Sequence, residues 1–140
     1  MTGAIAGHTV KPLPARNELI DEIRRAGSGC PITFGYPELP DGLYLQQDPP
    51  EFADFVAFMA KEAPPAELSI DIGVASGGQT KFLRDYYPCA RTITVDLGAH
   101  NDARHWPRIK QSLNTDHVLE ILDDSHAPRV RDSSCPSKER

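Results

Sequence analysis

The chain lacks the long apolar runs and the leader sequence that mark membrane and secreted proteins. No apolar stretch approaches the roughly 20 residues that a membrane-spanning helix needs, so we expect no membrane partner. The first residues, MTGAIAGHTVKPLP, have no charged start followed by an apolar run, which argues against a secretory signal. The sequence therefore favours a cytoplasmic protein.

Cysteine and positive charge are also scarce. The 3 cysteines are odd in number, lie far apart and form no C-x-x-C pair, a pattern that indicates neither a disulfide framework nor a zinc site. With 15 Lys and Arg against 20 Asp and Glu, the net charge is −5. Because binding to nucleic-acid phosphates requires an excess of basic residues, we expect no nucleic-acid partner.

What is present is the pattern of one small domain, which the length of 140 residues also indicates. We expect a flexible N-terminus over residues 1–15, a single α/β cofactor-binding domain over 16–126 and a disordered tail over 127–140. Within the domain, residues 16–66 form a helical lead-in and residues 67–126 form a βαβαβ unit.

The lead-in contains two predicted amphipathic helices. RNELIDEIRRAG (16–27) places three aliphatic side chains on one helical face and ends at a glycine. DPPEFADFVAFMAKEA (48–63) begins with Asp48 as the capping residue, followed by prolines in the first turn and by Glu51. Residues 28–47 are rich in proline and glycine and predict an irregular connector.

From residue 68 onward, strand-like and helix-like segments alternate. The predicted strands are LSIDIG (68–73), RTITVD (91–96) and HVLEIL (117–122). Helices are predicted between them at GQTKFLRDYY (78–87) and at about 103–113. The alternation indicates a parallel, right-handed βαβαβ unit, and therefore an α/β fold with a partial Rossmann-like sheet of three strands.

Acidic residues and glycines gather at the predicted carboxyl ends of these strands, where ligands bind in such sheets. Glycines at 73, 77 and 78 let the backbone approach a ligand closely. Asp96, at the end of the second strand, suits the two hydroxyls of a ribose, and Asp124 with Ser125 suits the polar edge of an adenine. Because Asp71 would repel a pyrophosphate, the pattern favours an adenosine whose other end is not strongly anionic.

The segments DIGVASGGQTKFL, TITVDLG and ILDDSHA resemble the class I S-adenosylmethionine-dependent methyltransferases, in particular the cephalosporin-hydroxylase-like and macrocin-type O-methyltransferases. The resemblance covers about residues 44–127. It implies S-adenosylmethionine as the cofactor and methyl transfer to an oxygen or nitrogen of a small-molecule acceptor. It also implies roles for individual residues. Asp71 would face the methionine amino group, Gly73, Ala75, Gly77 and Gly78 would line the methionine and ribose, Asp96 would bind the ribose, and Asp124 and Ser125 would flank the adenine.

The chain departs from this family in two respects. The family often has Glu where this chain has Asp71, and its fold continues through four more strands that carry the catalytic base, any metal ligands and much of the acceptor pocket. Residues 128–140 cannot replace them, so no catalytic residue and no metal ligand is assigned, and activity as an enzyme stays open. The first strand, central in the family's sheet, would form an open edge here, which favours pairing with a second copy of the chain.

Other interpretations of the same residues remain open. The glycine turn could serve packing alone, or it could be a degenerate phosphate-binding loop. Gly73, Gly78 and Thr80 have the spacing of such a loop, but Gln79 stands where the lysine belongs. The chain could also bind the cofactor without turnover, or act as an interaction module through its sheet edge.

Overall fold

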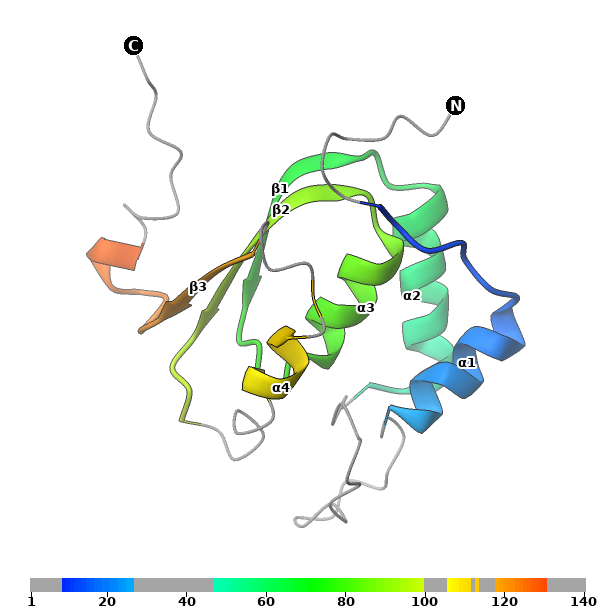
Figure 1. The fold of residues 1–140 in the computed structure, drawn as a ribbon, viewed down its shortest axis with the longest axis horizontal. Helices are drawn as coiled ribbons and strands as arrows, with labels where there is room; N and C mark the ends of the chain where they lie inside the picture. The colour runs from blue at the N-terminus through cyan, green and yellow to red at the C-terminus, as the bar shows by residue number, and fades with distance from the viewer. Residues whose placement is uncertain (1–8, 27–46, 100–105, 112, 114–117, 131–140) are drawn as a thin grey trace.

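The computed structural model describes residues 9–26, 47–99, 106–111, 113 and 118–130 of the chain. Strands and helices alternate, and three parallel strands form one sheet in the order β1-β2-β3 (Figure 1). The elements are α1 (Arg16–Arg25), α2 (Pro49–Lys61), β1 (Ala66–Ile72), α3 (Gly78–Tyr86), β2 (Cys89–Asp96), α4 (Trp106–Gln111) and β3 (Val118–Leu122). The predicted α/β fold, with two helices ahead of a three-stranded parallel sheet, is confirmed.

Local sequence signals explain where these elements begin and end. Asp48 caps α2, because its side chain accepts a hydrogen bond from the backbone N–H of Glu51 while two prolines occupy the first turn. β1 and β2 each begin two residues before the predicted strand. The predicted connector, except for its last residue, and the predicted starts of the third strand and of the helix before it lie outside the described residues.

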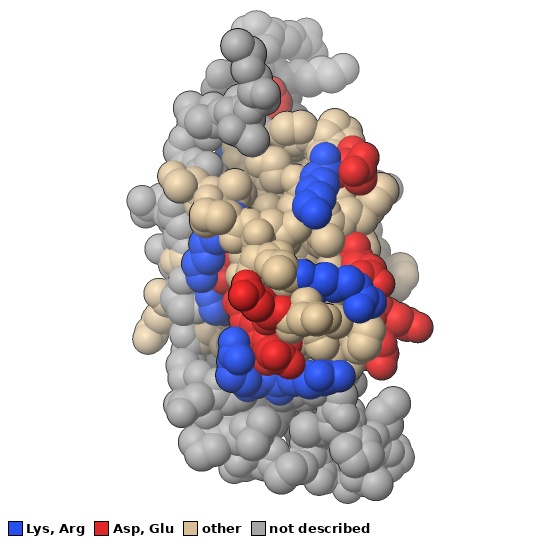
Figure 2. All heavy atoms as spheres, turned by 90° about the vertical axis from the view of Figure 1, so that its right-hand side faces the viewer, with Lys and Arg blue, Asp and Glu red and all other residues tan. Residues whose placement is uncertain are grey.

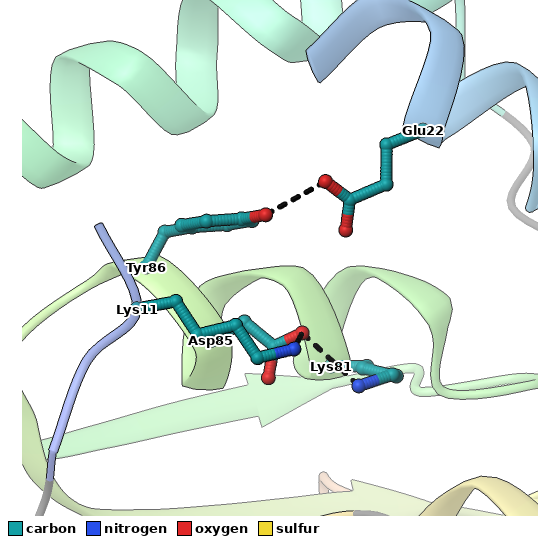
Figure 3. Close-up of polar contacts among 5 residues, drawn as sticks. All are labelled: Lys11, Glu22, Lys81, Asp85 and Tyr86. Carbon is teal, nitrogen blue, oxygen red and sulfur yellow. Dashed lines mark hydrogen bonds and ion pairs between the residues drawn. The ribbon is translucent and has the colours of Figure 1, made fainter. Parts of the chain in front are cut away.

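The described part of the predicted flexible N-terminus, residues 9–15, packs against α3. The backbone N–H of Lys11 donates to the carbonyl of Asp85, and its ammonium group lies 3.0 Å from the Asp85 carboxylate (Figure 3). Leu13 packs against the core formed by the helices. Residues 1–8 lie outside the described residues.

Residues 127–130 are the described part of the predicted disordered tail, and Ala127 and Val130 pack against the sheet. Residues 128–130 form a helical turn, and Val130 is only 4% exposed because it packs on Ile93 and Val95 of β2. Val130 is one of the few apolar side chains after β3, and the short turn that follows β3 places it against the sheet. Residues 131–140 lie outside the described residues.

The largest apolar cluster lies among the helices and contains no strand residue. Side chains of α1, α2 and α3 form it, with Phe52 edge-on to Phe82 at a ring-centroid distance of 5.7 Å. Tyr86 closes the cluster by donating its hydroxyl to Glu22 of α1 at 2.7 Å (Figure 3). Burial and this carboxylate raise the pKa of Tyr86. No helix among the described residues is long and apolar enough to cross a membrane.

The two faces of the sheet differ in chemistry. We call the side that carries the helices the helical face; its strand side chains are mostly polar and include Ser69, Asp71, Thr92, Thr94, Asp96 and Glu120. The opposite side is the aliphatic face, formed by Leu68, Ile70, Ile72, Ile93, Val95, Leu119 and Ile121. Among the described segments, Figure 1 shows α1 to α4 on one side of the sheet and the turn after β3 on the other.

β1 is an edge strand of the described sheet, since it pairs with β2 alone. The backbone N–H of Gly73 donates to Val95, and alternate residues of a parallel strand bond to the same neighbour. The peptide groups of Leu68, Ile70 and Ile72 therefore face away from β2. The edge predicted for the first strand is present in the part of the chain that the structure describes.

Candidate functional site

Asp96 lies at the carboxyl end of β2 and is held by two backbone amides. Its Oδ2 accepts a hydrogen bond from the N–H of Ala75 at 2.8 Å, and its Oδ1 accepts one from the N–H of Gly98 at 2.6 Å. A carboxylate has about four lone-pair positions, so, counting donors from the described residues, each oxygen keeps room for one more. The position of Asp96 follows from the parallel topology, which brings the end of β2 beside the turn after β1.

Ala75 reaches Asp96 through an unusual backbone conformation. Its φ of 50° lies in the left-handed region, which residues other than glycine seldom adopt. Glycines on either side of it, Gly73 and Gly77, also have positive φ. The hydrogen bond to Asp96 offsets part of the strain at Ala75 and fixes the turn against the end of β2.

The glycines of the turn serve different purposes. A methyl group on Gly77 would overlap the ring of Trp106, so this position needs glycine for packing as well as for its φ of 92°. A methyl group on Gly73 would meet nothing within 4 Å, and that residue is exposed. Gly78 is buried as the first residue of α3. The packing interpretation therefore holds for Gly77, whereas Gly73 leaves its backbone open to a ligand.

A cleft of about 460 Å³ opens beside Asp96 on the helical face, and its volume lies within the usual range of ligand sites. The turn after β1, the ends of β2 and β3, and α4 surround it. Its lining residues are Ala75, Asp96, Gly98, Trp106, Pro107, Lys110, Gln111, Glu120 and Leu122. Of the eight residues expected to contact a cofactor, Ala75 and Asp96 line this cleft.

Asp71 lies near Asp96 but does not line the cleft. It is on the helical face, and it accepts a hydrogen bond from the hydroxyl of Thr80 in α3. Burial raises the pKa of Asp71, the Thr80 hydroxyl lowers it, and the negative charge of Asp96 raises it further. The two carboxylates are thus close enough to interact, although the Thr80 hydroxyl already occupies one oxygen of Asp71.

Asp124 and Ser125 lie in the loop after β3, outside the cleft lining. Asp124 is exposed and accepts hydrogen bonds from the backbone N–H and the ring of His126, which lower its pKa. The neighbouring Asp123 forms a two-point ion pair with Arg129, which lowers the pKa of Asp123. Of the two predicted adenine contacts, Asp124 is therefore engaged with its own loop, and Ser125 does not line the cleft.

Sequence reasoning missed the side chains at the far wall of the cleft. Glu120 of β3 accepts a hydrogen bond from the indole N–H of Trp106 and lies 3.4 Å from the ammonium group of Lys110. Trp106 was recognisable as an aromatic residue that could lie near a base. Nothing in the sequence pairs Lys110 with Glu120, because they belong to different elements and meet only through the packing of α4.

Charges of opposite sign are interspersed on the helical side. Figure 2 shows Lys and Arg side chains beside Asp and Glu side chains on this side of the molecule. Arg16 pairs with Asp54, and both Lys11 and Lys81 lie 3.0 Å from Asp85. Within the described ranges, no three His, Cys, Asp or Glu side chains gather in a way that could hold a metal ion.

Comparison of the chain with protein-family models, with curated proteins and with solved structures finds no match. A function for this site must therefore be argued from its geometry and chemistry.

Proposed function

We propose that the chain binds S-adenosylmethionine in the cleft beside Asp96. The observation that carries this proposal is the carboxylate itself. Asp96 stands at a strand end, is held by the amides of Ala75 and Gly98, and borders the cleft with lone pairs that no other described residue occupies. The two hydroxyls of a ribose supply donors that match those lone pairs.

The rest of the cleft suits an adenosine that carries positive charge. Trp106, Pro107 and Leu122 give apolar walls to a flat base. Asp71 and Asp96 place negative charge under the glycine turn, which favours a sulfonium and an ammonium group over a pyrophosphate. Gly73 does not line the cleft, but it leaves the backbone at the start of this turn exposed. The same charges, together with Gln79 in place of lysine, disfavour a nucleoside triphosphate.

Methyl transfer to a small-molecule oxygen or nitrogen is the reaction that the family resemblance implies. The cofactor supplies an activated methyl group, so this chain's residues would act mainly by binding and orientation. Asp96 would fix the ribose, and the turn over residues 73–77 would fix the methionine end. No described side chain is assigned as the base that removes the acceptor's proton, so the proposal concerns binding first and turnover second.

Calorimetric titration with S-adenosylhomocysteine tests the proposal. We expect binding that Asp96→Asn weakens about 10-fold or more, because the amide group replaces a charged acceptor of two hydroxyl protons. Asp54→Asn is the matched control, since Asp54 is an exposed carboxylate on α2 that pairs with Arg16 of α1. Absence of binding, or equal affinity in the Asp96 variant, would contradict the proposal. Competition by ATP would instead favour the phosphate-loop alternative.

A second candidate function, pairing through the sheet edge, has its own supporting observation. The outward peptide groups of β1 lie beside Ile70 and Ile72, which are 47% and 64% exposed. Edge strands with unpaired peptide groups pair with other strands, and Glu67 is the only exposed charged residue of β1. Antiparallel pairing with a second copy about Ile70 would place Leu68 opposite Ile72 of that copy. Light scattering on a gel-filtration column tests this, and a strict monomer at high concentration would exclude it.

A further inference from the structure

The far wall of the cleft offers one hydrogen-bond acceptor and one donor side by side. The Oε2 atom of Glu120 accepts from the indole of Trp106 and lies 3.4 Å from the Lys110 ammonium group. Within the described residues, the other oxygen, Oε1, accepts no hydrogen bond from the protein. The Lys110 ammonium has three N–H donors and forms an ion pair with Glu120.

Both groups belong to the cleft and not to the outer surface. The side chains of Glu120 and Lys110 are 23% and 33% exposed, and both line the cavity that Asp96 borders. The indole holds the carboxylate in place, and the Trp106 ring is fixed in turn against Gly77. Asp96 and Glu120 point to the same side of the sheet, from neighbouring strands. A ligand whose sugar meets Asp96 therefore has its base directed along this wall.

We propose that Glu120 and Lys110 select the base of the bound nucleoside. Glu120 Oε1 accepts a hydrogen bond from the 6-amino group of adenine, and Lys110 donates one to the adjacent ring nitrogen. A 6-oxo purine places an oxygen against the carboxylate, which repels it. This assignment rests on the proposed binding of S-adenosylmethionine, and it gives the adenine contact to β3 and α4 instead of to Asp124 and Ser125.

The alternative is that Glu120 has only a structural role, in which its contacts with Trp106 and Lys110 hold α4 against β3. Glu120→Gln separates the two roles, because the amide oxygen still accepts the indole N–H while its NH₂ group replaces the free acceptor. A structural fastening survives this change. Base selection is altered by it, because a donor now faces the 6-position, where it matches a 6-oxo group better than a 6-amino group.

The experiment compares S-adenosylhomocysteine with its deaminated analogue, S-inosylhomocysteine. Trp106 is the only tryptophan, so its fluorescence follows occupancy of this cleft in the full chain. We expect the unaltered protein to prefer the adenine ligand about 10-fold or more, and Glu120→Gln to bring the two affinities close together or reverse their order. Lys110→Met weakens the adenine ligand and not the inosine ligand, because the ring nitrogen beside a 6-oxo group carries a proton and cannot accept from an ammonium group. Glu67→Gln, an exposed position on β1, is the matched control and leaves the preference unchanged.

Failure of this assignment differs from failure of the proposed function. If S-adenosylhomocysteine binds and Asp96→Asn weakens it, while Glu120→Gln keeps its thermal midpoint and the original adenine preference, the base assignment is overturned and the cleft assignment stands. If neither ligand binds, both are overturned. An unfolded Glu120→Gln variant would show that the structural role dominates. Lys110→Met must then weaken S-adenosylhomocysteine more than S-inosylhomocysteine, without loss of fold, for the assignment to survive.

Discussion

The two faces of the sheet solve the problem of burial in opposite ways. On the helical face, polar side chains under the helices each find a partner. Thr80 donates to Asp71, Arg84 donates to Thr92 and to the carbonyl of Cys89, and the hydroxyls of Ser69 and Thr92 are hydrogen-bonded to each other. On the aliphatic face, the side chains need no partner, but only the centre is covered. Ile93 and Val95 lie under Val130, whereas Leu119 is 53% exposed.

The contrast between the faces indicates which side of the sheet stabilises the domain and which side could bind another molecule. Buried polar groups are costly to leave unpaired, so the contacts between helices and sheet are specific and sensitive to change. The exposed aliphatic side chains contribute little to a monomer, because water still surrounds them. They instead form a surface that association with another molecule could bury.

The largest effect is expected from the buried arginine of the helical face. Arg84 is 3% exposed, and Arg84→Ala leaves the carbonyl of Cys89 without its donor and opens a cavity. We expect the free energy of unfolding to fall by about 3 kcal/mol in urea titrations. Arg91→Ala, an exposed arginine on the aliphatic face, should cost less than about 0.5 kcal/mol. Equal losses for the two arginines would break the comparison of the faces.

The centre of the aliphatic face should show an intermediate effect. Val130→Ala removes two methyl groups packed on Ile93 and Val95, so we expect a loss of about 1–2 kcal/mol in the same assay. Leu97→Ala, at an exposed position after β2, should stay within about 0.5 kcal/mol. A Val130 variant as stable as the parent would mean that the turn does not cover the sheet.

Asp71 should show a smaller effect of opposite sign, because burial raises its pKa. Its folded pKa exceeds its unfolded pKa, so its contribution to stability is complete below the unfolded pKa and is lost as pH rises through the folded pKa. Asp71→Asn should therefore be more stable than the parent at pH 7, with the difference growing from about pH 4 upward in thermal melts. A difference that shrinks with rising pH would contradict this assignment.

Asp54 provides the control for that slope. The hydrogen bond from Arg16 lowers the pKa of Asp54, so its contribution is present at neutral pH and is lost as pH falls through the folded pKa. Asp54→Asn should thus lose its difference from the parent in acid, the reverse of the behaviour expected for Asp71.

The smallest effect on folding is expected at the exposed column of the aliphatic face. Ile72→Thr should change the free energy of unfolding by less than about 0.5 kcal/mol, because the side chain is largely in water already. The same change should lower self-association in sedimentation experiments if β1 pairs with a second copy. A large loss of monomer stability would contradict the exposure of Ile72, because it would mean that another part of the chain covers this side chain.

Much of the fold could be predicted because its signals are local. The cap at Asp48, the prolines after it and the alternation of short strands with helices depend only on neighbouring residues. The place of Asp96 followed from a general rule, that parallel strands end at the same edge. The two amides that donate to Asp96 could not be predicted, because they depend on the backbone path of the turn. Ala75 has a positive φ there, which an alanine side chain does not indicate.

The far side of the site could not be predicted because it depends on packing between distant elements. Glu120 and Lys110 meet only where α4 lies against β3, and the orientation of α4 depends on the fit of Trp106 to Gly77. Asp124 stands at the predicted strand end, yet the loop turns so that His126 bonds to it. Position along the chain located the edge of the sheet but not the direction of each side chain.

The link between the beginning of the chain and α3 has a consequence for biosynthesis. Lys11 is joined to a residue 74 positions later, and Glu22 to one 64 positions later. α1 therefore emerges from the ribosome long before α3 has been synthesised, and the contacts between them can form only after α3 is complete. Synthesis of the intervening residues is far slower than closure of the segment, so translation, and not loop closure, sets the time at which these contacts form.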